Sequence, residues 1–152
     1  MSVKFFSSAL LVAGLSASGP LRADNHYVAE TDPPAGRFTT AAEVRPILGA
    51  TRANWVALRV FQGQDLVYVT QVFAWRCGLA GLRFGINGGA LQDWPLPECH
   101  KDGVTPNALL DGDGPPYRAF LEGTVDTIHI ELIYDDLGRE AATFTRDAVL
   151  MP

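Results

Sequence analysis

The alternation of apolar and polar side chains changes its period near residue 55, and each period predicts a different kind of element. Before that point, Thr40 and Glu43 have the spacing of a capping box, in which each side chain satisfies a free backbone N–H at a helix start. Pro46 follows six residues after Thr40 and removes one helical hydrogen bond, so we expect a short or kinked helix. The apolar stripe of this helix has the spacing i, i+3 and i+4: Val44, Ile47 and Leu48.

From residue 55 onward the period is 2, and β-branched and aromatic residues are frequent, which predicts strands. The segments WVALRVF (55–61) and DLVYVTQVFAW (65–75) form a predicted hairpin with Gly63 in its turn. The second segment has apolar side chains on both faces, as a covered central strand does. Further strands are predicted at LRFGING (82–88), YRAFL (117–121), TVDTIHIELIY (124–134) and REAATFTRDAVLM (139–151).

These elements make the chain mainly β, with about six antiparallel strands and one short N-terminal helix. Short strands and turn-rich connections favour an antiparallel β-sandwich of immunoglobulin-like type. The alternative is an α+β roll, in which the helix packs across a single curved antiparallel sheet. We found no internal repeat and no heptad pattern that would favour another architecture.

The N-terminus has the layout of a secretory signal peptide: Lys4, a short apolar run and then small residues. The run is shorter than the roughly 20 apolar residues that a membrane-spanning helix needs. Cleavage is predicted after Ala23, with Ser18 as the second choice. The expected organisation is a signal peptide (1–23), an extended or mobile lead (24–38) and one β-rich domain (39–152), in a periplasmic or secreted protein that is not inserted in the membrane after cleavage.

Cleavage after Ala23 removes Lys4 and Arg22, so the mature chain carries 10 basic and 17 acidic side chains, a net charge of -7. This balance excludes a nucleic-acid partner, because such proteins need a basic surface to displace counterions. All serines lie in the predicted signal peptide, and Lys101 is the one lysine after it. Serine hydrolase and Ser-Lys mechanisms are therefore excluded for the mature chain.

Cys77 and Cys99 are the two cysteines of the chain, and export favours a disulfide between them. Such a bond would contribute roughly 3 kcal/mol in the chain-entropy account. A metal site or a reactive thiolate beside His100 is disfavoured, because no CxxC or HxxxH cluster accompanies it. No cofactor is predicted.

The segment 89–116 is a long irregular loop rich in proline, glycine and aspartate, and loops of this length are often functional. It contains Asp93, Trp94 and Pro95 and, after Cys99, His100, and these four are the predicted binding residues. The prolines make a buried strand at Trp94 unexpected. Its indole is predicted either to fold back onto the core, which is slightly favoured, or to be exposed for a partner. With Cys99 in a disulfide, His100 is expected to be solvated.

Two other groups of polar residues suggest weaker alternatives. His129 and Glu131 share one strand face and, with Asp135, could serve as acid and base in a small hydrolase or lyase; a solvated sheet face is the favoured interpretation. Two acidic turns offer oxygen ligands for Ca²⁺, although aspartate is common in turns for local reasons. They contain Asp111, Asp113, Asp135 and Asp136.

The sequence therefore predicts an exported, non-enzymatic binding or accessory domain that contacts a protein or small ligand through its disulfide-stapled loop. The two alternatives are the small hydrolase or lyase and a structural component of the envelope that self-associates through a sheet edge or apolar patch.

Overall fold

A computed structural model describes residues 27–30 and 37–152. The predicted signal peptide and its cleavage site lie outside the described residues. The described chain is mainly β, with two antiparallel sheets. One sheet has the strand order β1-β2-β5, from Ala57–Phe61, Gln64–Tyr68 and Tyr117–Leu121. The other has the order β4-β3-β6-β7, from Gln92–Asp93, Leu79–Ile86, Thr127–Tyr134 and Arg139–Thr145. The two separate sheets differ from the single curved sheet of the alternative prediction.

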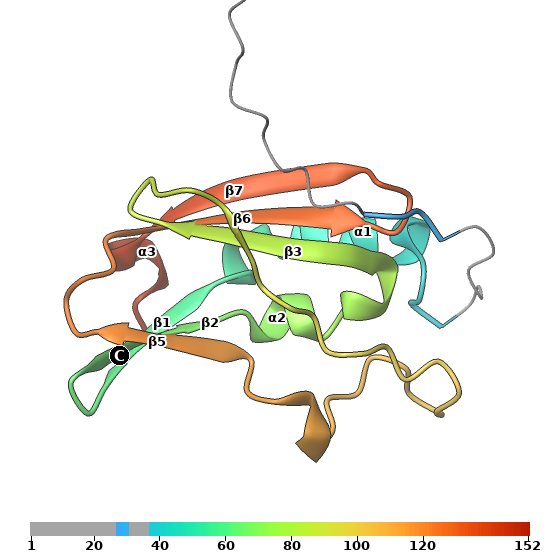
Figure 1. Ribbon diagram of the computed structural model, residues 1–152, viewed down its shortest axis with the longest axis horizontal. Coiled ribbons are helices and arrows are strands. Elements are labelled where there is room, and N and C mark those ends of the chain that lie inside the picture. Colours follow the sequence, from blue (N-terminus) through green and yellow to red (C-terminus); the bar gives the residue numbers. More distant parts are fainter. Residues whose placement is uncertain (1–26, 31–36) are drawn as a thin grey trace, which may run out of the picture.

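The two sheets lie at opposite sides of one hydrophobic core (Figure 1). The four-stranded sheet contributes the alternate residues of β3 and β6, such as Leu82 and Ile130, and the three-stranded sheet contributes Leu58 and Val67. The short helix α2, Thr70–Phe73, lies beneath β3. None of the helices among the described residues is long and apolar enough to cross a bilayer.

Helix α1, Ala41–Ala50, confirms the predicted N-terminal helix. The backbone N–H of Glu43 donates to Thr40 Oγ1, and the Glu43 carboxylate accepts from the Thr40 N–H, which is the predicted capping box. The buried face of α1 includes Val44 and Leu48. A Cβ at Gly78 would lie 2.7 Å from the Thr40 carbonyl oxygen, so glycine permits the close approach of α1 to the start of β3.

The predicted hairpin between the first two strands is confirmed, with a two-residue turn at Gln62 and Gly63. Both turn residues have positive φ, 49° and 76°, as a type I′ turn requires. This turn fixes the register of β1 against β2, so that the side chains on one face of the sheet point into the core and those on the other face point outward. The outward face carries in-register rows from β1, β2 and β5, among them Ala57, Tyr68 and Tyr117.

The prediction of one strand over 65–75 is wrong beyond Tyr68. The chain leaves the sheet there, forms α2, and then a 3-10 turn, Arg76–Gly78. Apolar residues on both faces of the predicted strand are explained by a change of period, because buried positions 69, 72, 73 and 76 have the i, i+3, i+4, i+7 spacing of a helix. The interpretation as a covered central strand therefore merged two elements.

The final predicted strand, 139–151, is also shorter than expected. β7 ends at Thr145, and a helical turn, α3 (Arg146–Val149), follows it. The C-terminal segment then reaches the three-stranded sheet, where the Met151 N–H donates to the Leu58 carbonyl oxygen at 2.7 Å. The C-terminus thereby covers part of the outer edge of β1.

A buried ion pair connects α3 to the three-stranded sheet. Asp65 of β2 is fully buried and accepts two hydrogen bonds from the Arg146 guanidinium, at 2.6 and 2.8 Å. The Val125 N–H donates to the same carboxylate. The hydrogen bonds from Arg146 lower the pKa of Asp65 to about 2, against the opposing effect of burial. The Asp65–Arg146 pair therefore holds the turn after β5 and the end of β7 next to β2.

Acid is therefore expected to weaken this link. Because the folded-state pKa of Asp65 is depressed, its ionised carboxylate stabilises the fold above about pH 4, and this stabilisation is lost as the pH falls through about 2. The loss of stability amounts to about 2 kcal/mol. Asp65→Asn is expected to lower the free energy of unfolding at pH 7 by about 3 kcal/mol and to remove this part of the acid dependence. Urea unfolding between these pH values measures both effects. The exposed Asp102→Asn is the control, and equal acid slopes for the wild type and Asp65→Asn would contradict the assignment.

Candidate functional site

The long loop 89–116 is held by one buried cation, Arg76, which lies between α2 and Cys77. The Arg76 side chain is fully buried. Its N–H groups donate at 2.7 to 3.2 Å to five backbone carbonyl oxygens, those of Phe73, Pro97, Glu98, Asn107 and Ala108. Within the described chain, the carboxylate that forms an ion pair with it is that of Asp113, at 3.4 Å. Burial lowers the pKa of Arg76. Most of the charge is therefore compensated by peptide dipoles of the loop.

The predicted disulfide between Cys77 and Cys99 is present. Asn107 adds a second connection, because its Oδ1 accepts from the Cys77 N–H and its Nδ2 donates to the Phe38 carbonyl oxygen. The loop is thus tied to the body covalently at residue 99 and by hydrogen bonds on both sides of it. These contacts anchor residues 97–99 and 107–108 of the loop to the body of the domain.

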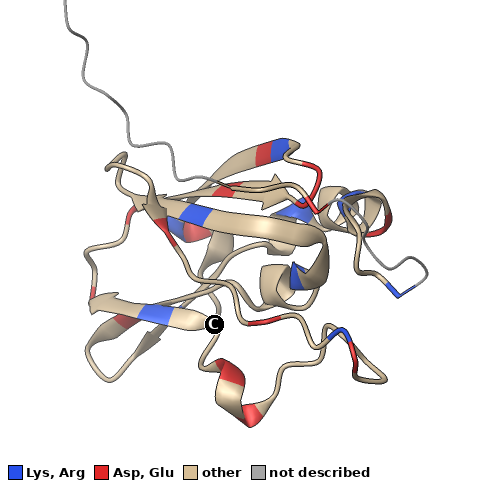
Figure 2. Cartoon of the chain, turned by 45° about the vertical axis from the view of Figure 1, so that its right-hand side comes forward, with Lys and Arg blue, Asp and Glu red and all other residues tan. Residues whose placement is uncertain are grey.

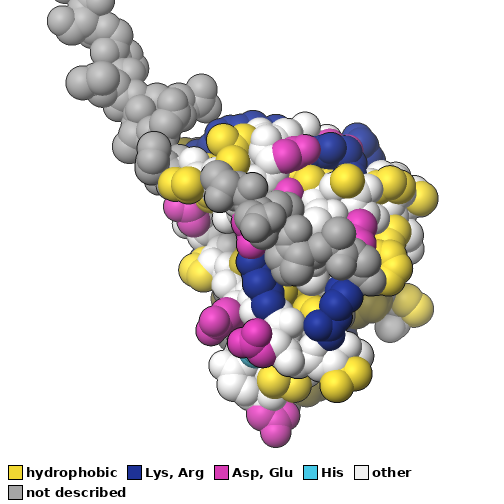
Figure 3. Space-filling view, turned by 90° about the vertical axis from the view of Figure 1, so that its right-hand side faces the viewer, with side chains coloured by type: hydrophobic (Ala, Val, Ile, Leu, Met, Phe, Trp, Pro, Cys, Tyr) yellow, Lys and Arg dark blue, Asp and Glu magenta, His cyan; other side chains and the backbone are white. Residues whose placement is uncertain are grey.

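His100 differs from the predicted solvated position. Its Nε2 lies 3.0 Å from both carboxylate oxygens of Asp113, and its side chain is 27% exposed. The pKa of Asp113 is lowered first by the N–H of Leu110, which donates to it at 2.8 Å, and then by His100. His100 and Asp113 therefore close the loop locally, and Figure 3 shows acidic and basic side chains interspersed at this end of the molecule.

Trp94 folds back onto the core and is 4% exposed. Its ring centroid lies 5.2 Å from that of Phe84 and 6.4 Å from that of Phe73, both edge to face. The expectation that the prolines exclude Trp94 from a strand agrees with the structure, in which β4 ends at Asp93. The Trp94 N–H donates to the Leu82 carbonyl oxygen directly after β4, and Pro95, which has no N–H, follows this last bond.

The other predicted binding residues next to Trp94 have separate positions. Pro95 is exposed. The Asp93 carboxylate accepts from the Tyr27 hydroxyl at 2.7 Å and lies 3.9 Å from Arg83 Nε. The structure thus places Trp94 in the core, Asp93 on the outer face of the four-stranded sheet, and His100 at the far end of the loop.

The side chains of the alternative enzyme site do not share one set of contacts. His129 Nδ1 lies 2.8 Å from Thr143 Oγ1. Glu131 accepts from Arg83 and Arg139 at 3.1 and 3.2 Å. Asp135 is buried under α1, where Oδ1 accepts from the first helical N–H, and burial raises its pKa. Within the described ranges, no group of three or more His, Cys, Asp and Glu side chains is arranged to hold a metal ion.

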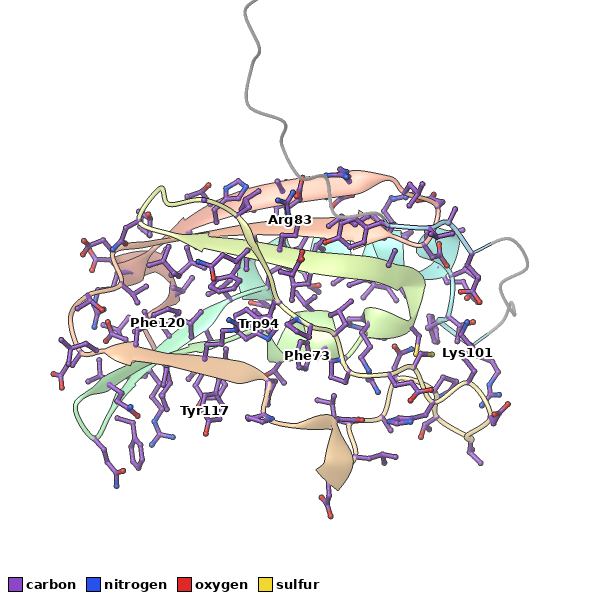
Figure 4. The ribbon with its side chains drawn as sticks, viewed as in Figure 1. Phe73, Arg83, Trp94, Lys101, Tyr117 and Phe120 are labelled. Carbon is purple, nitrogen blue, oxygen red and sulfur yellow. A yellow bond between two sulfur atoms is a disulfide. The ribbon has the colours of Figure 1, made fainter. Side chains whose placement is uncertain are left out.

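A groove of about 460 Å³ lies on the open side between the two sheets. Its walls come from β3 and the turn that follows on one side, and from β5 on the other. Figure 4 shows Phe120 pointing from β5 toward the segment that carries Trp94, whereas Tyr117 points away. The lining residues are Phe84, Ile86, Gly89, Ala90, Gln92, Arg118, Ala119 and Phe120.

The backbone of β5 presents an open edge to this groove. The directly opposed pairs Val69–Pro116 and Gly63–Glu122 are hydrogen-bonded, so by antiparallel alternation residues 118 and 120 also bond to β2. The backbone groups of Tyr117, Ala119 and Leu121 therefore point away from β2. The Leu121 carbonyl oxygen accepts from Thr124. The other outward groups of these three residues make no hydrogen bond with the described part of the chain.

Arg118 is the cation among the described residues that line the groove. Figure 2 shows how basic and acidic residues are distributed over the strands and loops. The guanidinium carbon of Arg118 lies 4.7 Å from the ring centroid of Phe84 and 5.1 Å from that of Trp94. Its hydrogen-bond partner is the Asp93 carbonyl oxygen, at 3.4 Å, and no carboxylate among the described residues forms an ion pair with it. Trp94 thus contributes to the groove indirectly, as a surface on which Arg118 rests.

Sequence reasoning missed both arginines. The signal for Arg76 was a lone charge inside the apolar run VFAWRCGLAGL, directly before a disulfide cysteine. The signal for Arg118 was the alternation of YRAFL, which places Arg118 and Phe120 on the core side of an edge strand.

Comparison with protein-family models, curated proteins and solved structures gives no match to this chain.

Replacing Arg76 by methionine keeps an apolar stem and removes the donors. We expect Arg76→Met to lower the free energy of unfolding by at least about 3 kcal/mol, because several buried carbonyl groups lose their partners. Amide hydrogen exchange should rise over residues 97–113. The exposed Arg59→Met is the matched control. Unchanged protection of the loop in Arg76→Met would show that the guanidinium does not hold it.

The disulfide makes a second prediction. The protein isolated from an oxidising compartment should show no free thiol in denaturant before reduction and two after it. Reduction is expected to cost roughly 3 kcal/mol of stability. Two free thiols before reduction would contradict the pairing of Cys77 with Cys99.

Proposed function

We propose that the mature chain is an exported, non-enzymatic binding domain that adds an extended segment of a protein partner to the edge of β5. The observation that carries this proposal is the open backbone edge at Tyr117, Ala119 and Leu121 beside a groove with both apolar and polar lining. An extended peptide gains main-chain hydrogen bonds from such an edge and specificity from pockets for its alternate side chains. The scaffold in this proposal is a β-sandwich whose open side is the groove.

The edge strand lacks several of the features that protect such edges from pairing. Its five residues contain no proline and no lysine, and Leu121 is 73% exposed. The opposite edge of the same sheet is partly covered by the C-terminus through Met151. One edge of the sheet is thus closed by the chain itself, and the other lies beside a groove.

The long loop retains a part in this function, although not through an exposed indole. Its first residues form one wall of the groove, and Trp94 supports the guanidinium of Arg118. That wall is aligned with β3 through the pairing of Gln92 with Phe84. The periplasmic or secreted location remains part of the proposal, because disulfides persist in oxidising compartments.

Selection from a phage-displayed library of random dodecapeptides tests the proposal. The peptides are selected on the mature wild-type protein, and their binding is then compared with binding to the Ala119→Pro variant. Proline at 119 removes an N–H that points away from β2, so the ladder within the sheet keeps its bonds, and edge strands tolerate proline. Peptides enriched on the wild type are expected to lose binding to Ala119→Pro by about ten-fold or more.

Ala119→Val is the matched control, because it changes the side chain and keeps the N–H. Binding should survive in this variant. Backbone amide NMR shifts on the wild type provide a second measurement that does not depend on the folding of any variant. They should be largest at residues 117, 119 and 121. Selection of no peptide, or of peptides that bind Ala119→Pro as well as wild type, would disprove the proposal.

A further inference from the structure

We infer that the segment bound at β5 carries a carboxylate that pairs with Arg118, two residues after an apolar side chain. This inference rests on the proposed function and names the chemistry of its partner. It follows from two observations: the side of β5 on which each groove residue lies, and the positive charge of Arg118, which forms no ion pair with a carboxylate of the described chain.

The register of β5 determines which side chains of a bound strand enter the groove. Arg118 and Phe120 point inward, whereas Tyr117, Ala119 and Leu121 point to the outer face. Side chains directly opposite each other in a β-ladder share one face. In a strand added antiparallel to β5, the residues opposite Phe120 and Arg118 therefore enter the groove, and the residue between them does not.

The two inward positions have different chemistry. The position opposite Phe120 meets the apolar wall that Ile86 and Phe84 help to form, so it favours an apolar side chain. The position opposite Arg118 meets a guanidinium that already rests on two aromatic rings. A carboxylate there gains charge-assisted hydrogen bonds that a neutral side chain lacks. Read from N to C, the bound segment is apolar, any residue, then Asp or Glu.

Charge complementarity favours this partner over a second copy of the chain. If two β5 strands paired antiparallel about Ala119, Arg118 of each copy would lie opposite Phe120 of the other. The two guanidinium groups would then stand diagonally on the same face without a carboxylate between them, which is unfavourable. The predicted mature chain is strongly acidic, so an arginine that forms no ion pair with the described residues is a local exception that suits an acidic segment.

The peptides from the dodecapeptide selection test the inference. The sequences that depend on the Ala119 N–H should share the apolar, any, acidic pattern. For one such synthetic peptide, exchange of its Asp or Glu for the amide should weaken binding to the wild type about ten-fold. On Arg118→Gln the same exchange should change binding less than about two-fold. Arg118→Lys, which keeps the charge, should recover part of the preference for the acid.

The outcomes separate this inference from the proposed function. Two results would overturn the carboxylate assignment and leave the edge-binding function in place. In the first, the peptides require the Ala119 N–H but show no acidic preference. In the second, the acid-to-amide exchange has the same effect on binding to the wild type and to Arg118→Gln. A dimer seen by light scattering at micromolar concentration and abolished by Ala119→Pro would overturn the assignment too, because the edge would already be occupied. Comparing the acidic peptide with its amide on the wild type gives a result even if Arg118→Gln does not fold.

Discussion

The buried guanidinium of Arg76 is the interaction on which the arrangement of the long loop depends. A segment of this length, with little regular structure, leaves many carbonyl groups without ladder partners. Arg76 supplies hydrogen-bond donors to five carbonyl groups from a single point inside the protein. An arginine suits this role because its charge persists in a buried position and its donors are spread over one rigid plane. The neighbouring disulfide keeps the same part of the loop beside these donors.

The proposed binding surface uses a different part of the loop, which is held by β3. Where the loop begins, β4 and Trp94 are aligned with β3, and Trp94 in turn supports Arg118 across the open side between the sheets. The groove therefore combines a wall whose position is held from the interior and a strand whose backbone lacks a neighbour. A preformed surface of this kind loses little conformational entropy when a partner binds. The partner itself, which is extended, carries most of that cost.

The sequence predicted the fold where one principle determined the local structure. The capping box at Thr40 located α1, and alternation along 124–134 located β6 with its inward isoleucines. It failed at 65–75, because positions 69 and 72 fit both a two-faced strand and a short helix, and only tertiary packing selects between them. The disulfide followed from compartment chemistry. The contacts of Arg76 and the open edge of β5 were not accessible, since both depend on which segments distant in sequence become neighbours.

The C-terminal contact of Met151 with Leu58 has a consequence for stoichiometry. A sheet with two open edges can join neighbours on both sides and extend into a fibre. In the three-stranded sheet, the chain's own end occupies part of one edge, so recruitment through this sheet is limited to the other. In the proposed function, the three-stranded sheet then has one edge for strand addition, that of β5. The C-terminal contact therefore gives the proposed binding by this sheet a direction, with β1 shielded in part and β5 open.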